Sequence, residues 1–156
     1  MVDDFPIMHQ SAALYQAAAA ALYSRSSVQL AESERKGASL KPDTPAFNEM
    51  MGGFMGSVVL HAFALELAMK SLCLKRGVSF PRTHNLACLF AALPKDDQET
   101  ASEGFRQRDP KSELEEFLRA NANTFVEWRY QHEYKPATVM SEHLAIAFDQ
   151  IYKLSK

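Results

Sequence analysis

The sequence predicts an all-α fold, an up-and-down bundle of four long helices and one short helix. Three observations support this prediction: apolar residues recur at helical spacing along most of the chain, strand-like alternation is nearly absent, and helix-start and helix-stop residues divide the segments. With 156 residues, 47% of them apolar and 23% charged, the chain is large enough for one core, and no repeat or linker divides it. We therefore expect a single domain over residues 1–156.

The first predicted helix runs from about Met8 to about Glu34. Its many alanines have the highest helix propensity of any residue, and its apolar residues follow helical spacing. Gly37 and Pro42 then indicate a loop over residues 35–43.

The second helix is predicted to be the centre of the molecule. Thr44 and Pro45 form an N-cap followed by a first helical residue, and the helix continues to Arg76, where Gly77 is suited to a left-handed cap. Three glycines lie early in this helix, each costing about 1 kcal/mol relative to alanine, so we expect a close helix crossing or a local break there: Gly52, Gly53 and Gly56.

A short third helix is predicted after Thr83, which can act as its cap, and Pro94 ends it. Its apolar positions are Leu86, Leu89, Phe90 and Leu93. The stretch over residues 95–110 is polar, and we expect one irregular helical turn at most.

The last two predicted helices follow. Ser112 and Glu115 form a capping box for a helix whose apolar stripe reaches Trp128, with a kink at residues 121–124. After a break at residues 134–136, the final helix is predicted over Thr138 to Leu154. Its apolar face consists of Met140, Leu144, Ala147, Phe148, Ile151 and Leu154.

Composition excludes several classes of protein. A net charge of -2 argues against binding nucleic acid through a broad positive field, although a local basic cleft is compatible with it. The two cysteines, Cys73 and Cys88, lie in apolar helical runs, as is typical of a reduced cytosolic protein. No signal peptide is visible, and the most apolar stretch contains His61, Glu66 and Lys70, so we expect a cytoplasmic protein without a membrane partner.

Motifs for metal and cofactor chemistry are absent from the sequence. The five histidines show none of the HxxxH, HExxH or ExxH spacings of helical zinc and di-iron sites. There is also no P-loop, no GxGxxG following a strand and no GxSxG elbow. We therefore expect no metal and no cofactor.

One pair of charges on the second helix points to a site. On a helical wheel, Glu66 and Lys70 fall among apolar residues rather than on a solvated side, so burial is expected. A buried charge pair needs further polar partners, which another part of the fold has to provide.

Two segments can provide these partners. One is the run Arg82-Thr83-His84 before the third helix. The other is residues 125–133, where aromatic residues alternate with ionisable ones. In one interpretation, residues 125–133 are an amphipathic helix end with surface charges; in the other, Arg129 points inward beside Glu66 and His84.

These residues, in this order, resemble the HEPN (higher eukaryotes and prokaryotes nucleotide-binding) family. The run from His61 to Leu72 is similar to the central helix of that family, and the loop containing Pro81 to Leu86 is similar to the one that follows it. Residues 125–130 are similar to an aromatic-Arg-Tyr signature found in one version of the family. The resemblance covers about residues 56–133.

The resemblance implies a helical bundle, a homodimer, and a role in toxin–antitoxin pairs, phage defence or RNA processing. It also implies a nucleotide or RNA ligand and, in a toxin–antitoxin pair, a nucleotidyltransferase-like partner. The glycine- and methionine-rich start of the second helix permits close approach of a helix from the same chain or a second copy. Many family members are metal-independent ribonucleases with arginine, four to six residues, and then histidine; this sequence lacks that spacing.

Three functions remain open from the sequence. The first is a module that binds a nucleotide, RNA or a partner protein through Glu66, Lys70, Arg82, His84, Arg129 and Tyr130. The second is a divergent metal-independent ribonuclease, with His84 as general base and Arg129 or Arg82 stabilising the phosphorane charge. The third is a structural or oligomerisation protein, in which the same charges only fix the helix register.

Overall fold

The computed structural model describes residues 4–37, 41, 42, 44–129 and 141–156, and in these ranges its regular structure is entirely helical. The all-α class is therefore confirmed. The helices of the described ranges are α1 (Asp4–Arg35), α2 (Pro45–Arg76), α3 (Leu86–Ala91), α4 (Lys95–Arg108), α5 (Leu114–Ala120), α6 (Thr124–Arg129) and α7 (Ser141–Leu154).

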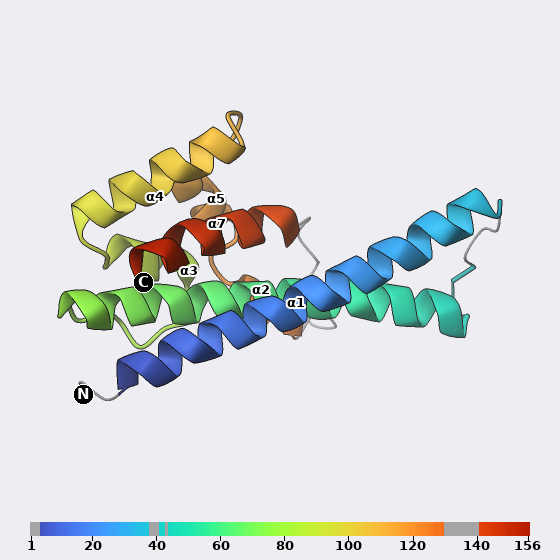
Figure 1. Cartoon of the computed structure of the whole chain (residues 1–156), viewed down its shortest axis with the longest axis horizontal. Coiled ribbons are helices and arrows are strands. Elements are labelled where there is room, and N and C mark those ends of the chain that lie inside the picture. Colours follow the sequence, from blue (N-terminus) through green and yellow to red (C-terminus); the bar gives the residue numbers. More distant parts are fainter. Residues whose placement is uncertain (1–3, 38–40, 43, 130–140) are drawn as a thin grey trace.

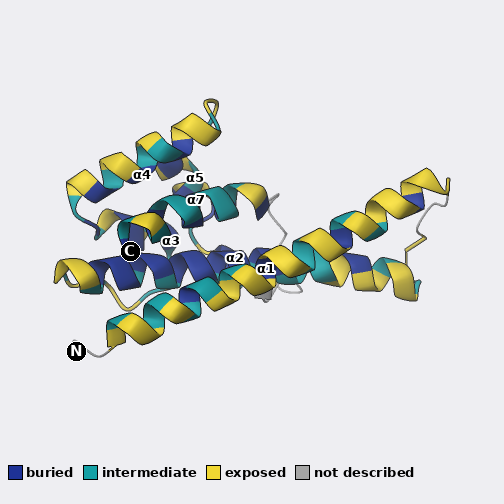
Figure 2. Cartoon of the chain, in the orientation of Figure 1, coloured by how far each residue is buried: buried dark blue, intermediate teal, exposed yellow. Residues whose placement is uncertain are grey.

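The two longest helices, α1 and α2, extend well beyond the rest of the molecule (Figure 1). The other helices gather around the C-terminal half of α2, so the end of α1 and the beginning of α2 project together as a two-helix arm. We define the arm as residues 24–35 and 45–53. The remainder, the bundle, contains nearly all of the buried apolar side chains (Figure 2).

Helix α2 forms the centre of the bundle, and its predicted bounds are confirmed. Thr44 Oγ1 accepts a hydrogen bond from Phe47 N at 3.3 Å, and Pro45 occupies the first helical turn. Gly77 ends the helix in the left-handed region, with φ 68°, where glycine avoids the steric cost of a Cβ atom. By length and composition α2 is apolar enough to cross a membrane, yet 67% of its most apolar window is buried, as in a core helix.

The early glycines of α2 allow a close crossing with α1. A Cβ added at Gly53 would collide with Ser26 Oγ, and one added at Gly56 would lie 3.2 Å from Leu22 Cδ1. Gly52 has open space around it. The predicted close crossing is thus confirmed and α2 is unbroken. Because Gly53 and Gly56 face α1 of the same chain, their small size does not indicate contact with a second copy.

Two helix starts differ from their predictions. Helix α1 begins at Asp4, four residues before the predicted Met8, with an acidic residue in its first turn. Helix α3 is capped by Asn85, whose side-chain oxygen accepts from Cys88 N at 2.9 Å, and the predicted cap, Thr83, is wrong. Thr83 Oγ1 instead accepts from Asn85 N at 3.0 Å and shapes the loop before the helix.

The prediction for residues 95–110 is wrong, because α4 is a regular helix of 14 residues. Its inward side is narrow, consisting of Asp97, Ala101 and Phe105 at intervals of four residues. Arg76 Nε and Nη2 donate to the two carboxylate oxygens of Asp97, both at 2.8 Å, and join the end of α2 to the first turn of α4.

The predicted capping box of α5 is also wrong. The N-cap is Glu113, without a side-chain capping bond, and the Ser112 hydroxyl bonds Asp109 instead. The predicted kink is confirmed, since turn residues 121–123 separate α5 from α6.

Helix α7 buries four residues of its predicted apolar face, namely Leu144, Ala147, Phe148 and Ile151, against the bundle. Residues 138–140 of the predicted final helix, and the predicted break at residues 134–136, lie outside the described residues.

Candidate functional site

The candidate site is built around a buried carboxylate in the middle of α2. The Glu66 side chain is only 2% exposed, and Lys70 Nζ, one turn later, donates to Glu66 Oε1 at 2.6 Å. The Lys70 side chain is itself only 15% exposed. The predicted burial of this pair is therefore observed, and the ammonium compensates part of the cost of removing the carboxylate from water.

The third member of the cluster is His84, which comes from the loop before α3. His84 Nδ1 lies 2.9 Å from Glu66 Oε2 and 3.2 Å from Glu66 Oε1. The His84 side chain is 53% exposed, so its ring joins the buried carboxylate to the surface. Of the polar partners that the sequence predicted for Glu66, His84 is one that the structure places in contact with it.

This contact fixes the orientation of the imidazole. An ionised carboxylate can only accept hydrogen bonds, so Nδ1 of His84 is the donor. In the neutral ring, the lone pair is then on Nε2, the nitrogen on the other side of the ring from Glu66. When a carboxylate binds one nitrogen of a histidine ring in this way, the other nitrogen of the neutral ring is fixed as the one that carries the lone pair.

A run of aromatic rings, one from each of four segments, supports the cluster. The ring centroids of His84 and Phe125 are 5.1 Å apart, Phe125 stacks on Phe63 at 4.9 Å, and Phe63 meets Tyr15 edge-on at 4.8 Å. Sequence reasoning missed the supporting roles of Phe63 and Phe125. The available signal was the position of Phe63 beside Glu66 on the helical wheel.

Just after His84, two hydrogen bonds fasten the loop to the turn before α6. Leu86 N donates to Ala122 O at 2.8 Å, and Asn85 Nδ2 donates to Asn123 Oδ1 at 3.4 Å. The start of α3 is thereby tied to the turn before α6, which carries Phe125. These bonds hold the residues that follow His84 against the turn that leads into Phe125.

The other predicted site residues are placed only in part. Arg82 is exposed in the loop, two residues before His84. Arg129 is the last residue of α6, one turn after Phe125, but its side chain lies outside the described part of the chain. Tyr130 lies outside the described residues altogether, and so the predicted inward position of Arg129 stays a prediction.

Two other histidines, the buried His61 and the partly buried His143, have structural partners. His61 Nδ1 lies 2.8 Å from Ser141 Oγ, joining α2 to α7, and burial lowers the pKa of His61 to about 4. His143 Nε2 lies 2.6 Å from Asp109 Oδ2, joining α7 to the end of α4. The hydrogen bond from Ser112, and then that from His143, lowers the pKa of Asp109. Among the residues that the structure describes, no three His, Cys, Asp or Glu side chains are grouped to hold a metal ion.

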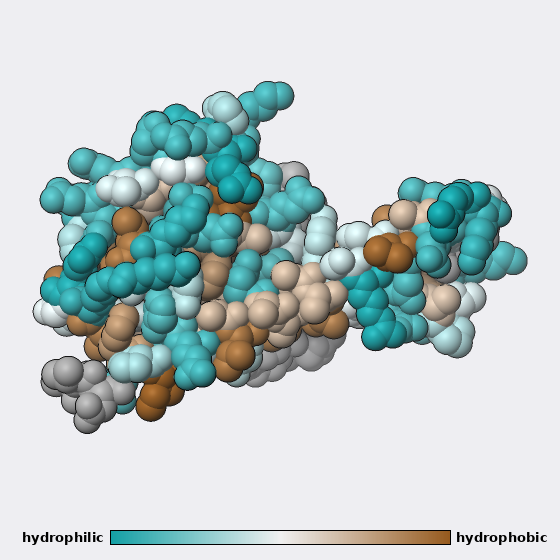
Figure 3. All heavy atoms as spheres, in the orientation of Figure 1, coloured by the Kyte–Doolittle hydropathy of each residue, from teal (hydrophilic) through white to brown (hydrophobic). Residues whose placement is uncertain are grey.

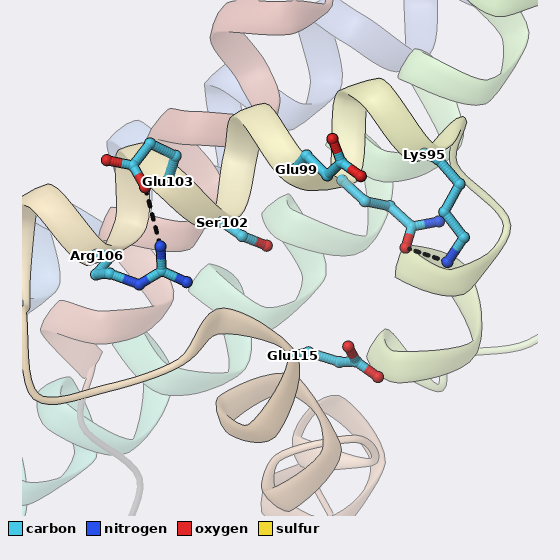
Figure 4. Close-up of a pocket in the computed structure, with 7 residues that line it drawn as sticks. Lys95, Glu99, Ser102, Glu103, Arg106 and Glu115 are labelled. Carbon is cyan, nitrogen blue, oxygen red and sulfur yellow. Dashed lines mark hydrogen bonds and ion pairs between the residues drawn. The ribbon is translucent and has the colours of Figure 1, made fainter.

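A depression between α4 and α5 is polar, and several of its side chains already bond one another or their neighbours (Figure 4). Its volume is about 440 Å³. Arg106 bonds both Glu103 and Glu113, while Lys95 donates to Gln98 at 3.3 Å. This surface groove therefore presents fewer unpaired charges to a ligand than its composition indicates.

Comparison with known proteins identifies the domain. A family model described as HEPN domain matches residues 48–150, which include Glu66, Lys70 and His84 and leave α1 outside the match. No curated protein and no solved structure matches the chain.

Proposed function

Because the chain belongs to the HEPN domain family, a helical module with a nucleotide- or RNA-related role, we propose that it binds a nucleotide or an RNA end at His84. The observation that carries this proposal is the contact between the buried Glu66 carboxylate and His84 Nδ1. It makes Nε2 of the half-exposed ring the contacting atom. The module acts in the cytoplasm, as the composition leads us to expect.

The chemistry of this nitrogen suits a ribonucleotide. A neutral His84 ring accepts a hydrogen bond at Nε2 from a ribose hydroxyl, and a protonated ring donates one to a phosphate oxygen. Arg82, exposed in the same loop, adds a positive charge for a phosphate. The net charge of -2 favours a short ligand over a long duplex, which a broad basic surface would bind.

A binding titration tests the proposal. Trp128 is the only tryptophan and lies in α6, one turn from Phe125, so its fluorescence reports on this side of the bundle. We expect a short single-stranded RNA to change this fluorescence saturably. We expect the His84→Gln variant to bind at least about tenfold more weakly, since one hydrogen bond to a charged group contributes about 1.5–3 kcal/mol.

The matched control is His9→Gln, which removes a histidine that stacks on Tyr152 with ring centroids 4.3 Å apart and bonds Ser155. It should bind RNA like the wild type. Equal affinities for the wild type and His84→Gln would overturn the assignment of the site, and a lack of binding by the wild type to nucleotides and RNA would overturn the function.

A second function, metal-independent RNA cleavage, is favoured by the same Glu66–His84 contact. A ring oriented by a carboxylate can take the proton of a ribose 2′-hydroxyl at Nε2, and Arg129 or Arg82 would stabilise the charge developing on the phosphate. Incubation of end-labelled RNA with the protein in chelator tests this. Cleavage by the wild type that is lost in both His84→Ala and Arg129→Ala supports the enzyme, and undiminished cleavage by either variant rejects that residue's role.

A toxin–antitoxin or defence role follows from the family alone. Co-purification of the tagged chain with a nucleotidyltransferase-like protein from its native cells would support it. Recovery of the chain without such a partner would argue against that role.

A further inference from the structure

A groove lies between the N-terminal half of α1 and the middle of α2. Its volume is about 330 Å³, near the lower bound for pockets that hold small molecules. Tyr15 of α1 and Phe63 and Leu67 of α2 are among its lining residues. Figure 3 shows apolar atoms along this half of α1, at the lower left of the molecule. The groove is therefore suited to a small, flat and mainly apolar group.

One face of α2 carries both this groove and the buried ion pair of the candidate site. Phe63 and Leu67 line the groove, while Glu66 and Lys70 form the ion pair. Counted from Phe63, the other three residues follow after three, four and seven positions, which places all four on one side of the helix. The groove and the ion pair are therefore neighbours along α2.

The ring of Phe63 joins the groove to His84. Phe63 stacks on Phe125 with ring centroids 4.9 Å apart, and the centroid of Phe125 lies 5.1 Å from that of His84. Two ring contacts thus separate His84 from a wall of the groove, a span comparable with the length of one nucleotide. A nucleotide whose ribose or phosphate contacts His84 is therefore long enough to reach the groove with its base.

Tyr15 and Phe63 form an aromatic corner in the groove. Their ring centroids are 4.8 Å apart, and their planes are inclined by 70°. A flat ring that stacks on one of them meets the other edge-on, and aromatic rings attract each other in both arrangements. Tyr15 is 38% exposed, so its ring is accessible to a ligand. Proteins bind the bases of single-stranded nucleic acids by stacking them on side chains of this kind.

Charge keeps a phosphate out of the groove. Asp4 is the one charged residue among the lining residues in the described part of the chain, and its carboxylate repels a phosphate. The groups that suit a phosphate, the exposed Arg82 and the half-exposed ring of His84, belong to the loop before α3. The base is therefore the part of a nucleotide that the groove accepts.

A hydroxyl group in the groove favours a purine. Ser11 also lines the groove, and it precedes Tyr15 by one turn, about 6 Å along the axis of α1. Among the described residues its hydroxyl has no hydrogen-bond partner, so it can bond a ring nitrogen or an amino group of a base. A base of two fused rings is long enough to stack in the corner and reach this hydroxyl, whereas a single pyrimidine ring is shorter.

From these contacts we infer that the groove holds the base of the nucleotide bound at His84, and that this base is a purine stacked in the corner formed by Tyr15 and Phe63. The inference rests on the proposed function and gives that site its base preference. It also adds to the site residues of α1, which lies outside the region that the family model matches. Helix α1 thus contributes to ligand binding as well as to the packing of the bundle.

Calorimetric titration of the full chain with adenosine monophosphate, uridine monophosphate and ribose 5-phosphate tests the inference. Adenosine monophosphate should bind at least about tenfold more tightly than ribose 5-phosphate, which has no base to stack on the aromatic corner. Uridine monophosphate should bind with an intermediate affinity. Tyr15→Leu should weaken the binding of adenosine monophosphate about tenfold and leave that of ribose 5-phosphate unchanged. Tyr15→Phe, which keeps the ring, should retain most of the affinity.

The matched control is Tyr23→Leu, the same change further along α1, where the Tyr23 hydroxyl donates to Glu142 at 3.0 Å. It should bind adenosine monophosphate like the wild type. Ser11→Ala should narrow the difference between the adenosine and uridine nucleotides. Far-UV circular dichroism should show unchanged helicity for Tyr15→Leu, because this side chain is exposed on the surface of α1.

His84→Gln separates this inference from the proposed function, since it should weaken the binding of adenosine monophosphate and ribose 5-phosphate alike. Two results would overturn the base subsite while that loss upheld the proposed function. One is a wild type that binds the two ligands equally, and the other is a Tyr15→Leu variant that binds adenosine monophosphate like the wild type. Uridine monophosphate bound as tightly as adenosine monophosphate would overturn the purine preference. A wild type that binds none of the three ligands would overturn the subsite and the proposed function together.

Discussion

The two halves of α2 are parts of one uninterrupted helix but have very different surroundings. From Ser57 to Cys73 the helix is enclosed by α1, α3, α6 and α7, and most of its residues are buried, including Glu66. In the arm, residues 45–53 lie beside α1, and Met50 is the one buried apolar residue among the described residues of the arm. The helices that pack around α2, rather than the sequence of α2 itself, thus decide where a charged side chain is buried and held in one position. They also decide where apolar side chains stay exposed to solvent.

The difference in packing between the two halves of α2 should have its largest effect on the free energy of unfolding. Two methionines, one in each half of the helix, test this. Met69→Ala should lower the free energy of unfolding by about 2–5 kcal/mol, because Met69 is fully buried and its removal leaves a cavity. Met51→Ala should change it by less than about 0.5 kcal/mol, since Met51 is exposed on the arm. Urea denaturation of both variants measures the difference, and similar losses would show that the arm is packed as tightly as the bundle.

Much of the helical structure could be predicted from the sequence. The bounds of α2 followed from Thr44, Pro45 and Gly77, whose backbone preferences act locally. Helix α4 was missed because only Asp97, Ala101 and Phe105 of its residues are buried, too narrow an apolar stripe for the pattern to detect. Its charges gave a usable signal, since Asp96 and Asp97 open the helix and Arg106 and Arg108 end it, in agreement with the helix dipole.

The buried charge at the centre of the site could be predicted from the sequence, but its tertiary contacts could not. The burial of Glu66 followed from its apolar neighbours on the wheel, and the need for a polar partner followed from the cost of burying charge. The sequence offered both His84 and Arg129 as that partner. The choice depends on how the loop before α3 folds back over α2. That arrangement is set by the bonds from Leu86 to Ala122 and from Asn85 to Asn123, between residues far apart in the chain.

A smaller effect is predicted for the two neighbouring glycines of the arm. Gly52→Ala should stabilise the protein by up to about 1 kcal/mol, because the added methyl group meets open space and alanine favours the helix. Gly53→Ala should bring no such gain, since its methyl group would collide with Ser26 Oγ. Thermal unfolding measures both. Ser26→Ala in the Gly53→Ala background should recover part of the lost stability, and equal stabilisation by both glycine changes would refute the close crossing.

A further effect concerns pH and His61, in the bundle half of α2. The pKa of His61 is lowered from 6.5 to about 4 by burial, so the unfolded chain takes up a proton at this residue before the folded chain does. Stability is therefore complete above about pH 6.5 and falls as the pH drops toward 4. We expect a loss of about 2 kcal/mol at pH 5 relative to pH 7.

The variant His61→Gln should lack this part of the pH dependence. His9, whose pKa is also lowered, first by burial, contributes in the same direction, so His9→Gln serves as the comparison. Asp109 and Glu113, whose pKa values are lowered by their hydrogen-bond partners, lose their contributions as the pH falls from their ordinary pKa values of 3.8 and 4.5 toward the lowered ones, below the range used here. Urea denaturation at pH 5 and pH 7 measures the slope, and an unchanged slope in His61→Gln would contradict the burial of a neutral ring.

The most direct test of the account is the state of the His84 ring, observed by long-range ¹H–¹⁵N NMR with and without a short single-stranded RNA. The His84→Gln spectrum identifies its signals among those of the five histidines. The account predicts that the neutral ring carries its proton on Nδ1, facing Glu66, and that RNA shifts the Nε2 signal of His84 while leaving that of His9 in place. A proton on Nε2 in the free protein, or bound RNA that leaves the His84 signals unmoved, would contradict it.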